Sequence, residues 1–296
     1  MLDHKLYTYL KVVELKSYTK AAEALNLTQP AVTQHIKKLE EFYDARFIEV
    51  KGRSLHLTEQ GRLLYSYANY QMANEEQLRA QMRKMDIPLK VGATLSIADY
   101  YLPGYLSAYL DQSDSLLSIT VKNTESIIEM LLKNELYCAF IEGIFDTSLF
   151  HYKEFVTTRF MPVARTGHPL AGRKVEMSEI LNFPLILREK GSGTREIFEN
   201  YLYEHNESLL SASRVYEVSS FGILKKLIQH SDAITFMYEG VPRREIEERE
   251  LTFLDIKDYE IRRPLYFIYP NHSLMKERNE EFFRTLMQTR QDQIVF

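Results

Sequence analysis

Short hydrogen-bonding side chains recur at a helical spacing near the start of the chain. Gln29, Thr33 and Lys37 are four residues apart, so they share one side of a helix, and Gln34 lies beside them. Amide and hydroxyl groups on such a side can hydrogen-bond to base edges in the major groove, while lysines contact phosphates. A polar stripe of this kind also occurs on ordinary solvated amphipathic helices, so both interpretations stand at this point.

A second group of polar residues, Gly191–Arg195, follows an apolar segment in the second half of the chain. Its two glycines, the second at Gly193, let backbone N–H groups converge, and a helix is predicted to begin here. Ser192 and Thr194 add hydroxyl groups and Arg195 adds a positive charge. Together these are the components of an anion site. The Gly-Lys-Ser/Thr ending of a nucleotide-binding loop is absent, and the glycines also fit a simple turn.

Two further loops place hydroxyl groups between a predicted strand and a predicted helix. Thr94 and Ser96 follow one strand, and Ser219 and Ser220 follow another. Ligands of parallel sheets bind beyond the carboxyl ends of the strands, so these loops are candidates for the same cleft. The alternative is that the hydroxyl groups serve only as helix N-caps, the usual role of Ser and Thr there.

Glu142 follows the apolar strand Cys138–Ile141 and forms a fourth candidate wall of the cleft. A carboxylate would disfavour a deeply bound anion, unless it points away or pairs with Arg195.

The polar stripe requires two helices joined by a tight turn. Thr19 is the predicted N-cap of the first helix and Thr28 that of the second, where Pro30 is tolerated in the first turn. Apolar residues at helical spacing predict that the second helix buries one side and that a preceding helix packs beneath it. These residues are Val32, Ile36 and Leu39, and before them Leu6, Leu10 and Val13.

A hairpin and a long helix are predicted next. Residues 47–50 and 55–57 are predicted to form the two strands of the hairpin. Arg53 at the hairpin tip either reaches a minor groove or a phosphate, or is an ordinary turn arginine. Thr58 then caps a helix that continues without proline to about Lys84. Its apolar strip has no cover in the small N-terminal segment, which favours pairing with a second copy of the chain; the alternative is packing on the next domain.

From residue 88 onward, predicted strands alternate with helices. This alternation predicts parallel sheets, and its two successive sets predict two lobes around a cleft, which would bring the three hydroxyl-bearing loops together. The predicted strands include Phe155–Val156 and Met161–Ala164. One predicted helix, Ile97–Leu110, contains the step Leu102–Pro103, which can reset it.

Composition limits the possible functions. The 296 residues are 45% apolar, so sizeable cores can form, and the single cysteine, Cys138, allows no disulfide within the chain. Cysteine usage and the lack of a signal peptide or a membrane-spanning segment favour the cytoplasm. The net charge is −4, yet residues 1–62 carry ten Lys and Arg against eight Asp and Glu, a balance that suits nucleic acid slightly better.

The sequence shows no catalytic set. The eight histidines are scattered without metal-ligand spacing, no Gly-x-Ser-x-Gly elbow occurs, and Cys138 lies in an apolar strand typical of a core. We therefore expect no catalytic residue, no metal site and no cofactor. An enzyme acting on a small phosphorylated or carboxylated substrate remains one alternative, and a ligand sensor acting through a protein partner remains another.

Two adjacent segments carry a family resemblance. Ser17–Leu25 reads SYTKAAEAL and Thr28–Glu40 reads TQPAVTQHIKKLE, and together they resemble the helix-turn-helix of LysR-type transcriptional regulators. Val163–Ala171, which reads VARTGHPLA, resembles a signature that crosses between lobes in the same family. The family usually has a leucine, a phenylalanine and an arginine at the first hairpin strand. This chain has Phe47, Ile48 and Val50, so the arginine contact to phosphate is in doubt.

The resemblance implies a winged helix-turn-helix at residues 1–58, a dimerising linker helix at 59–87 and an α/β effector-binding region at 88–296, similar to periplasmic binding proteins. Lobe 1 would span about 88–162 and 267–296, and lobe 2 about 163–266. It also implies that Thr94, Ser96 and the loop at Gly191–Arg195 line the effector pocket.

The expected function is a transcriptional regulator that binds a pseudo-palindromic double-stranded DNA operator as a dimer or tetramer. A small effector, expected to be an anion, would bind between the lobes and change how the operator is held, and thereby the access of RNA polymerase. The loop Leu187–Arg195 is similar to family members linked to sulfur or other inorganic anions.

Overall fold

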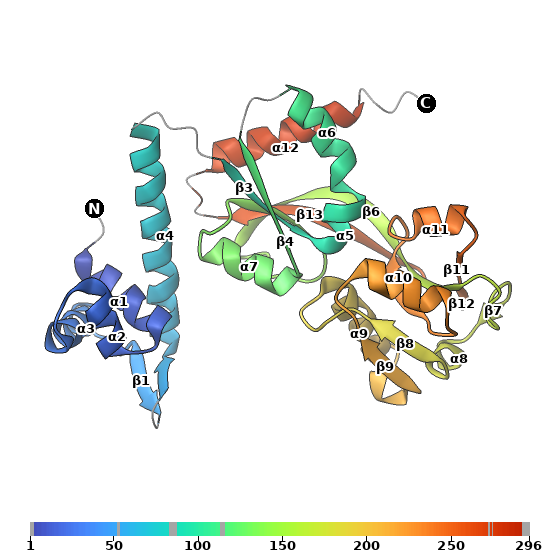
Figure 1. Ribbon diagram of the computed structural model, residues 1–296, viewed down its shortest axis with the longest axis horizontal. Helices are drawn as coiled ribbons and strands as arrows, with labels where there is room; N and C mark the ends of the chain where they lie inside the picture. Colours follow the sequence, from blue (N-terminus) through green and yellow to red (C-terminus); the bar gives the residue numbers. More distant parts are fainter. Residues whose placement is uncertain are drawn as a thin grey trace. The chain divides into compact units, whose positions relative to one another are not determined.

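The computed structural model describes residues 3–51, 54–82, 88–112, 116–271, 273 and 275–291 (Figure 1). The chain divides into two compact units, one comprising Met1–Pro88 with Leu132–Glu135 and the other Leu89–Leu131 with Leu136–Phe296. Arg53 at the predicted hairpin tip and residues 83–87 at the predicted end of the long helix lie outside the described residues. Predictions about them remain predictions.

The first unit contains three packed helices, a hairpin and a long helix. They are α1 (His4–Leu15), α2 (Tyr18–Leu25), α3 (Gln29–Tyr43), β1 (Ile48–Lys51), β2 (Ser54–Leu57) and α4 (Glu59–Met82). The predicted apolar stripes meet in one core, which also takes in Phe47 and two residues of α4. The sequence-based prediction of a three-helix core followed by a hairpin is confirmed.

The caps of the paired helices agree with the prediction in one case and correct it in the other. Thr28 caps α3, accepting a hydrogen bond from the backbone N–H of Ala31 at 3.4 Å. The N-cap of α2 is Ser17 and not Thr19, because the Ser17 hydroxyl accepts from the backbone N–H of Lys20 at 3.2 Å. The helix therefore starts two residues earlier than predicted.

Gly61 joins α4 to the rest of the first unit. The buried hydroxyl of Tyr9 on α1 donates to the Gly61 carbonyl oxygen at 2.7 Å. A Cβ atom at position 61 would lie 2.1 Å from the carbonyl oxygen of Phe47, so only glycine permits this approach. Thr58 caps α4 as predicted, accepting from the Gly61 N–H at 2.9 Å. None of the described helices, α4 included, is long and apolar enough to cross a membrane.

The second unit is built on a sheet that joins seven described strands in the order β10-β6-β13-β5-β3-β4, with β11 also paired to β6. The strands are β3 (Leu89–Thr94), β4 (Leu117–Lys122), β5 (Cys138–Ile141), β6 (Phe150–Arg165), β10 (Thr235–Tyr238), β11 (Leu251–Phe253) and β13 (Ile261–Pro270). Helices α12 (Lys276–Gln291) and α7 (Thr124–Leu132) lie on opposite sides of this sheet (Figure 1). Side chains of β5 alternate between them: Phe140 contacts Phe282 of α12, whereas Ala139 and Ile141 pack in the cluster that includes α7.

The helices of this unit and two small strand pairs complete the fold. The helices are α5 (Leu95–Tyr100), α6 (Leu102–Gln112), α7 (Thr124–Leu132), α8 (Met177–Leu181), α9 (Gly193–Glu204), η1 (Leu209–Ser211), α10 (Phe221–Gln229), α11 (Arg243–Glu247) and α12 (Lys276–Gln291). The strand pairs are β7 (Lys174–Val175) with β12 (Asp255–Ile256), and β8 (Pro184–Leu187) with β9 (Arg214–Glu217). The predicted helix Ile97–Leu110 is divided into α5 and α6, with the break at Tyr101, directly before the predicted step Leu102–Pro103.

The large sheet corrects two sequence-based predictions. It is mixed rather than parallel, because β13 returns between β5 and β6 and is antiparallel to both. The two short strands predicted at Phe155–Val156 and Met161–Ala164 are one continuous strand, β6. Its first part pairs with β13, and its last residues pair with β10 and β11. The predicted division into two lobes remains a prediction, because the described residues of this region form one compact unit.

The Gly61 contact gives a stability prediction. Gly61→Ala should weaken the first unit by about 3 kcal/mol, because the new methyl group overlaps the Phe47 carbonyl and forces α4 away from the hairpin. Hydrogen exchange of the α1 and α4 amides in the intact chain measures the local opening free energy.

The control is Gly104→Ala in α6, where the new methyl group would have no other atom within 4 Å. This variant should gain about 0.5–1 kcal/mol. Equal protection of α1 and α4 in Gly61→Ala and in the unmodified chain would contradict the Gly61 contact.

Candidate nucleic-acid interface and anion site

One side of α3 anchors the helix and the other side faces outward. Val32, Ile36 and Leu39 are at most 5% exposed and belong to the core of the first unit. The side chains of α3 and its N-cap that are predicted to contact DNA are all exposed. This set is Thr28, Gln29, Pro30, Thr33, Gln34 and Lys37. The apolar side therefore fixes α3 in the core, and the polar side is accessible to a binding partner.

The exposed groups on α3 are lightly engaged. The Thr33 hydroxyl donates to the backbone carbonyl of Gln29 at 3.0 Å, so its oxygen can still accept a hydrogen bond. Lys37 lies 3.8 Å from Glu41, a separation at which an exposed ion pair adds little stability. The ammonium group of Lys37 is therefore readily exchanged onto a phosphate.

In the second unit, glycine brings the end of β5 against the start of α9. A Cβ atom at Gly193 would lie 2.7 Å from the carbonyl oxygen of Glu142. Gly143 has a φ of 92°, and a Cβ there would lie 2.8 Å from the Gly193 Cα. Gly193 thus serves close backbone approach, whereas Gly191, with a φ of 82°, serves the turn. The Glu142 side chain is thereby held at the N-terminus of α9.

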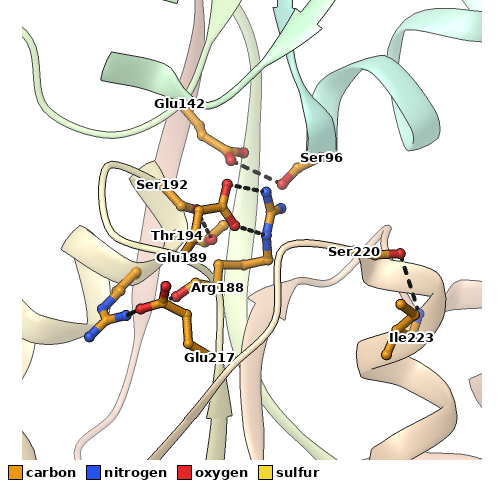
Figure 2. A network of polar contacts seen from close by, with 10 residues as sticks. Ser96, Glu142, Arg188, Glu189, Ser192, Thr194, Glu217, Ser220 and Ile223 are labelled. Atoms are coloured by element: carbon orange, nitrogen blue, oxygen red, sulfur yellow. Dashed lines mark hydrogen bonds and ion pairs between the residues drawn. The ribbon is translucent and has the colours of Figure 1, made fainter. Parts of the chain in front are cut away.

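Glu142 is buried, with 2% of its surface exposed. Its Oε1 accepts a hydrogen bond from the Ser96 hydroxyl at 3.0 Å, and its Oε2 has no partner among the described residues (Figure 2). Burial raises the pKa of this carboxyl to about 7, against the smaller lowering effects of the Ser96 hydrogen bond and of Arg188. The carboxyl therefore exchanges its proton near neutral pH.

Arg195 does not pair with Glu142. Its guanidinium binds Glu199 at 2.7 Å and Glu217 at 2.6 Å, and it also donates to the carbonyl oxygen of Arg188 at 3.2 Å. The charge of Arg195 thus holds α9 to β9 and to the end of β8. Whether it also contacts an effector remains a prediction.

Arg188, which the sequence analysis did not single out, is the cation beside Glu142. It is 5% exposed and its Nε and Nη2 bind both oxygens of Glu189 at 2.9 and 3.0 Å (Figure 2). Its Nη1 is buried and has no partner among the described residues. The guanidinium lies 4.6 Å from the centre of the Phe221 ring. The sequence signal was a charged pair placed directly at the carboxyl end of an apolar strand.

The structure brings several other predicted residues to the same place. Thr94 is buried with no partner for its hydroxyl within the described chain, and the Ser192 and Thr194 hydroxyls lie 2.8 Å apart. The Thr124 hydroxyl, also missed from sequence, donates to the Glu142 carbonyl at 3.0 Å. We define the Glu142–Arg188 site as Thr94, Ser96, Glu142, Arg188, Glu189 and the start of α9.

Ser220 behaves as the N-cap alternative predicted. The Ser220 hydroxyl accepts from the backbone N–H of Ile223 at 3.4 Å and lies apart from Glu142 in Figure 2. Ser219 is exposed. The contacts of these residues therefore give no support for effector binding, which remains a prediction for both.

A hollow of about 480 Å³ opens beside the predicted anion loop. It is lined by Thr124, Glu125, Ile128, Ile144, Lys190, Gly191, Ser192, Arg195, Glu196 and Glu199. Ser96 and Glu142 are not part of this lining, so the hollow borders the Glu142–Arg188 site without containing it. Within the described part of the chain, no three His, Cys, Asp or Glu side chains are grouped to hold a metal ion.

Burial of Glu142 makes stability depend on pH. With its folded pKa near 7 and its ordinary value at 4.5, the stability that the neutral carboxyl contributes is complete below pH 4.5. It is lost as pH rises through 7. The side chain of Glu142→Gln stays neutral at every pH. Between pH 4.5 and pH 7, the unfolding free energy of this variant should therefore rise by about 3 kcal/mol relative to that of the unmodified chain.

Urea unfolding on both sides of this pH window measures the gain. Glu277→Gln on α12 is the control, because that side chain is exposed and stays in water. A difference between Glu142→Gln and the unmodified chain that does not change with pH would contradict the raised pKa.

Comparison with known proteins shows which family this architecture matches. Residues 4–62 match the family described as bacterial regulatory helix-turn-helix protein, lysR family, and residues 87–291 match the LysR substrate binding domain. The HTH-type transcriptional regulator CysL of Bacillus subtilis (strain 168) is 30% identical over 292 residues, covering 96% of each protein.

Two solved structures share the fold. Full-length LysG of Corynebacterium glutamicum with bound effector Arg covers 96% of this chain and 97% of its own, at 16% identity and a TM-score of 0.68. The regulatory domain of CcmR from Synechocystis PCC6803 in complex with 2-PG covers 67% of this chain and 95% of its own, at 26% identity and a TM-score of 0.61.

These relatives are named as regulators, so the enzyme alternative is set aside. The two matches account for the exposed helix of the first unit and for the α/β region that follows. The chain belongs to the family of LysR-type transcriptional regulators.

Proposed function

We propose that this regulator binds a pseudo-palindromic operator as a homo-oligomer and responds to a small anionic effector at the Glu142–Arg188 site. The observation that carries the proposal is the exposed polar side of α3, opposite the apolar stripe that is buried in the core. Effector binding changes how the operator is held and thereby alters the access of RNA polymerase.

The exposed side chains along α3 differ in the contacts that they can make with DNA. Gln29 near the helix start carries an amide that can read a base edge, and adenine is the base that best matches an amide. Lys37 carries charge to a phosphate, which adds affinity without sequence preference. Thr33 offers an acceptor and a methyl group, which suits contact with a thymine methyl.

Exposed apolar side chains support self-association of the first unit. On α4, Leu63 is 74% exposed and Met82 is 76% exposed. Beside Leu63, a hollow of about 580 Å³ is lined by Tyr43, Ala45, Phe47, Gln60, Leu63, Leu64 and Tyr67. Large apolar groups gathered around one hollow are typical of an interface, and a second copy of α4 would cover them. Two copies would present two α3 helices to two half-sites.

The free groups of the Glu142–Arg188 site support an anionic effector. Arg188 Nη1 is a buried donor without a partner in the described chain, and the N-cap Ser192 makes no side-chain hydrogen bond to the first N–H groups of α9. A buried donor left unpaired destabilises the protein, and an oxyanion would satisfy it. The complex of the CcmR domain with 2-PG is consistent with a small effector in this fold.

Two variants of α3 test the interface with DNA. Gln29→Ala should lose about 1–3 kcal/mol of discrimination at one base pair in each half-site. Lys37→Gln should weaken binding to all sequences alike and should lower the salt slope of log affinity by about one per subunit. Electrophoretic mobility shifts with the flanking promoter DNA, repeated over a salt series, measure both effects.

The matched control is Lys174→Gln, which makes the same charge change on β7 in the second unit. It should leave affinity and salt slope unchanged. If Gln29→Ala and Lys37→Gln bind DNA as the unmodified chain does, α3 is not the reading element.

A variant on α4 tests self-association. Leu63→Glu places a charge in the proposed interface and should raise the dissociation constant of the dimer at least about tenfold, because a leucine loses its burial. Sedimentation velocity over a concentration series measures this shift. Leu210→Glu, at a side chain 96% exposed in the second unit, is the control and should not change assembly. Equal assembly in both variants would rule out this face.

A further inference from the structure

The Glu142–Arg188 site holds two buried groups of opposite kind, and each has one unused atom. Glu142 Oε2 and Arg188 Nη1 have no hydrogen-bond partner in the described chain. Figure 2 shows that the Arg188 guanidinium reaches from the end of β8 toward the Glu142 carboxyl, with Ser96 beside both. A bound molecule in this place would therefore meet a donor from Arg188 and a carboxyl oxygen from Glu142 at the same time.

The charges of this site do not by themselves favour an anion. Arg188 is already matched by Glu189, which binds it through two hydrogen bonds. An ionised Glu142 would leave the site with one net negative charge, and Arg195 is engaged by Glu199 and Glu217. An anion entering next to an ionised, buried carboxylate would meet strong repulsion, because the surroundings screen charge poorly.

The other groups near Glu142 offer hydrogen bonds but no positive charge. Ser96 of α5 donates to Oε1, and Tyr101, which follows α5, already bonds to Thr158 and to the backbone N–H of Gly240. The buried Tyr238 of β10 adds no net charge at neutral pH, and the pKa of its hydroxyl is well above the ordinary value because it is buried. None of these groups can offset a second negative charge.

We propose that the Glu142–Arg188 site accepts an anion only together with one proton, which is shared between Glu142 Oε2 and the bound anion. This inference rests on the proposed effector site and adds its selectivity. When the carboxyl is ionised, Oε2 accepts a hydrogen bond from a ligand that carries its own acidic or hydroxyl hydrogen. When the ligand carries none, Glu142 takes a proton from solvent and donates it to a ligand oxygen.

The consequence is a rule about ligand class. Above the titration of Glu142, the site favours an oxyanion that also has a hydrogen-bond donor, such as hydrogen phosphate, a phosphate monoester or a hydroxy acid. It disfavours a fully ionised oxyanion such as sulfate, which has acceptors only. A pKa of about 7 for the buried carboxyl places the change in preference near neutral pH.

Titration of the full-length protein with inorganic sulfate and inorganic phosphate tests the proposal by calorimetry. Because Glu142 titrates near pH 7, sulfate should bind about 30-fold more weakly at about pH 8.5 than at about pH 6. Phosphate retains a hydrogen at both values and should change far less. Near pH 8.5, two buffers of different ionisation enthalpy should report uptake of about one proton per sulfate.

Glu142→Gln supplies the decisive comparison, since its amide N–H₂ donates at every pH. Sulfate binding to this variant should become independent of pH, and phosphate should lose its advantage at the higher pH. Glu277→Gln, an exposed change on α12, should behave as the unmodified chain. Arg188→Gln should lose affinity for both anions, because it removes the unpaired donor.

The outcomes separate this inference from the proposed function. Binding of both anions with equal affinity at the two pH values would overturn the proton requirement and leave the anion site standing. So would a pH dependence that persists in Glu142→Gln. If neither anion binds the unmodified chain while promoter DNA still does, the anionic effector of the proposed function is wrong, and the proton requirement falls with it.

Discussion

The burial of one carboxyl group against the start of a helix is the constraint on which the second unit depends. Glu142 can lie there only because Gly193 and Gly143 have no side chains, so that the end of β5 and the first turn of α9 meet backbone to backbone. This contact removes water from the carboxyl and leaves Ser96 as its one hydrogen-bond donor among the described residues. The chemistry of the site follows from the burial of the Glu142 carboxyl.

The two arginines in this region are paired with nearby carboxylates. Arg188 is matched by Glu189, and Arg195 by Glu199 and Glu217. Arg195, which also donates to the Arg188 carbonyl oxygen, thereby holds α9 to β9 and to the end of β8. What remains without a partner among the described side chains of the site is Arg188 Nη1, the Thr94 hydroxyl and Glu142 Oε2. Such a site recognises by hydrogen bonding more than by net charge.

Sequence reasoning found the elements whose spacing alone determines them. The stripe on α3 at Val32, Ile36 and Leu39 depends only on helical periodicity, and its buried side was predicted correctly. The hairpin was found from its strand-turn-strand pattern, and the start of α4 from its capping residue Thr58. The missed N-cap shows the limit: Ser17 and Thr19 both suit the position, and local sequence does not choose between them.

The rest could not be predicted because it depends on contacts between distant segments. Nothing in the residues near Arg188 indicates that it lies close to Glu142. Glu199 is four residues after Arg195, a helical spacing, but nothing nearby indicates that Arg195 also pairs with Glu217 on β9. Strand β6 was divided in the prediction because polar residues interrupt its apolar pattern, yet pairing with β13 and β10 keeps it continuous. The mixed sheet likewise follows from where β13 inserts, which alternation of elements does not reveal.

The contact at Gly61 also determines how the first unit can move. Its carbonyl is bonded to Tyr9 of α1, and its Cα lies against the backbone of Phe47 just before the hairpin. The base of α4 is thus fastened to the same core that carries α3. A displacement of the base of α4 would therefore be transmitted to α3 through this shared core. The long helix is then a lever arm, and its length amplifies small displacements into changes of reach.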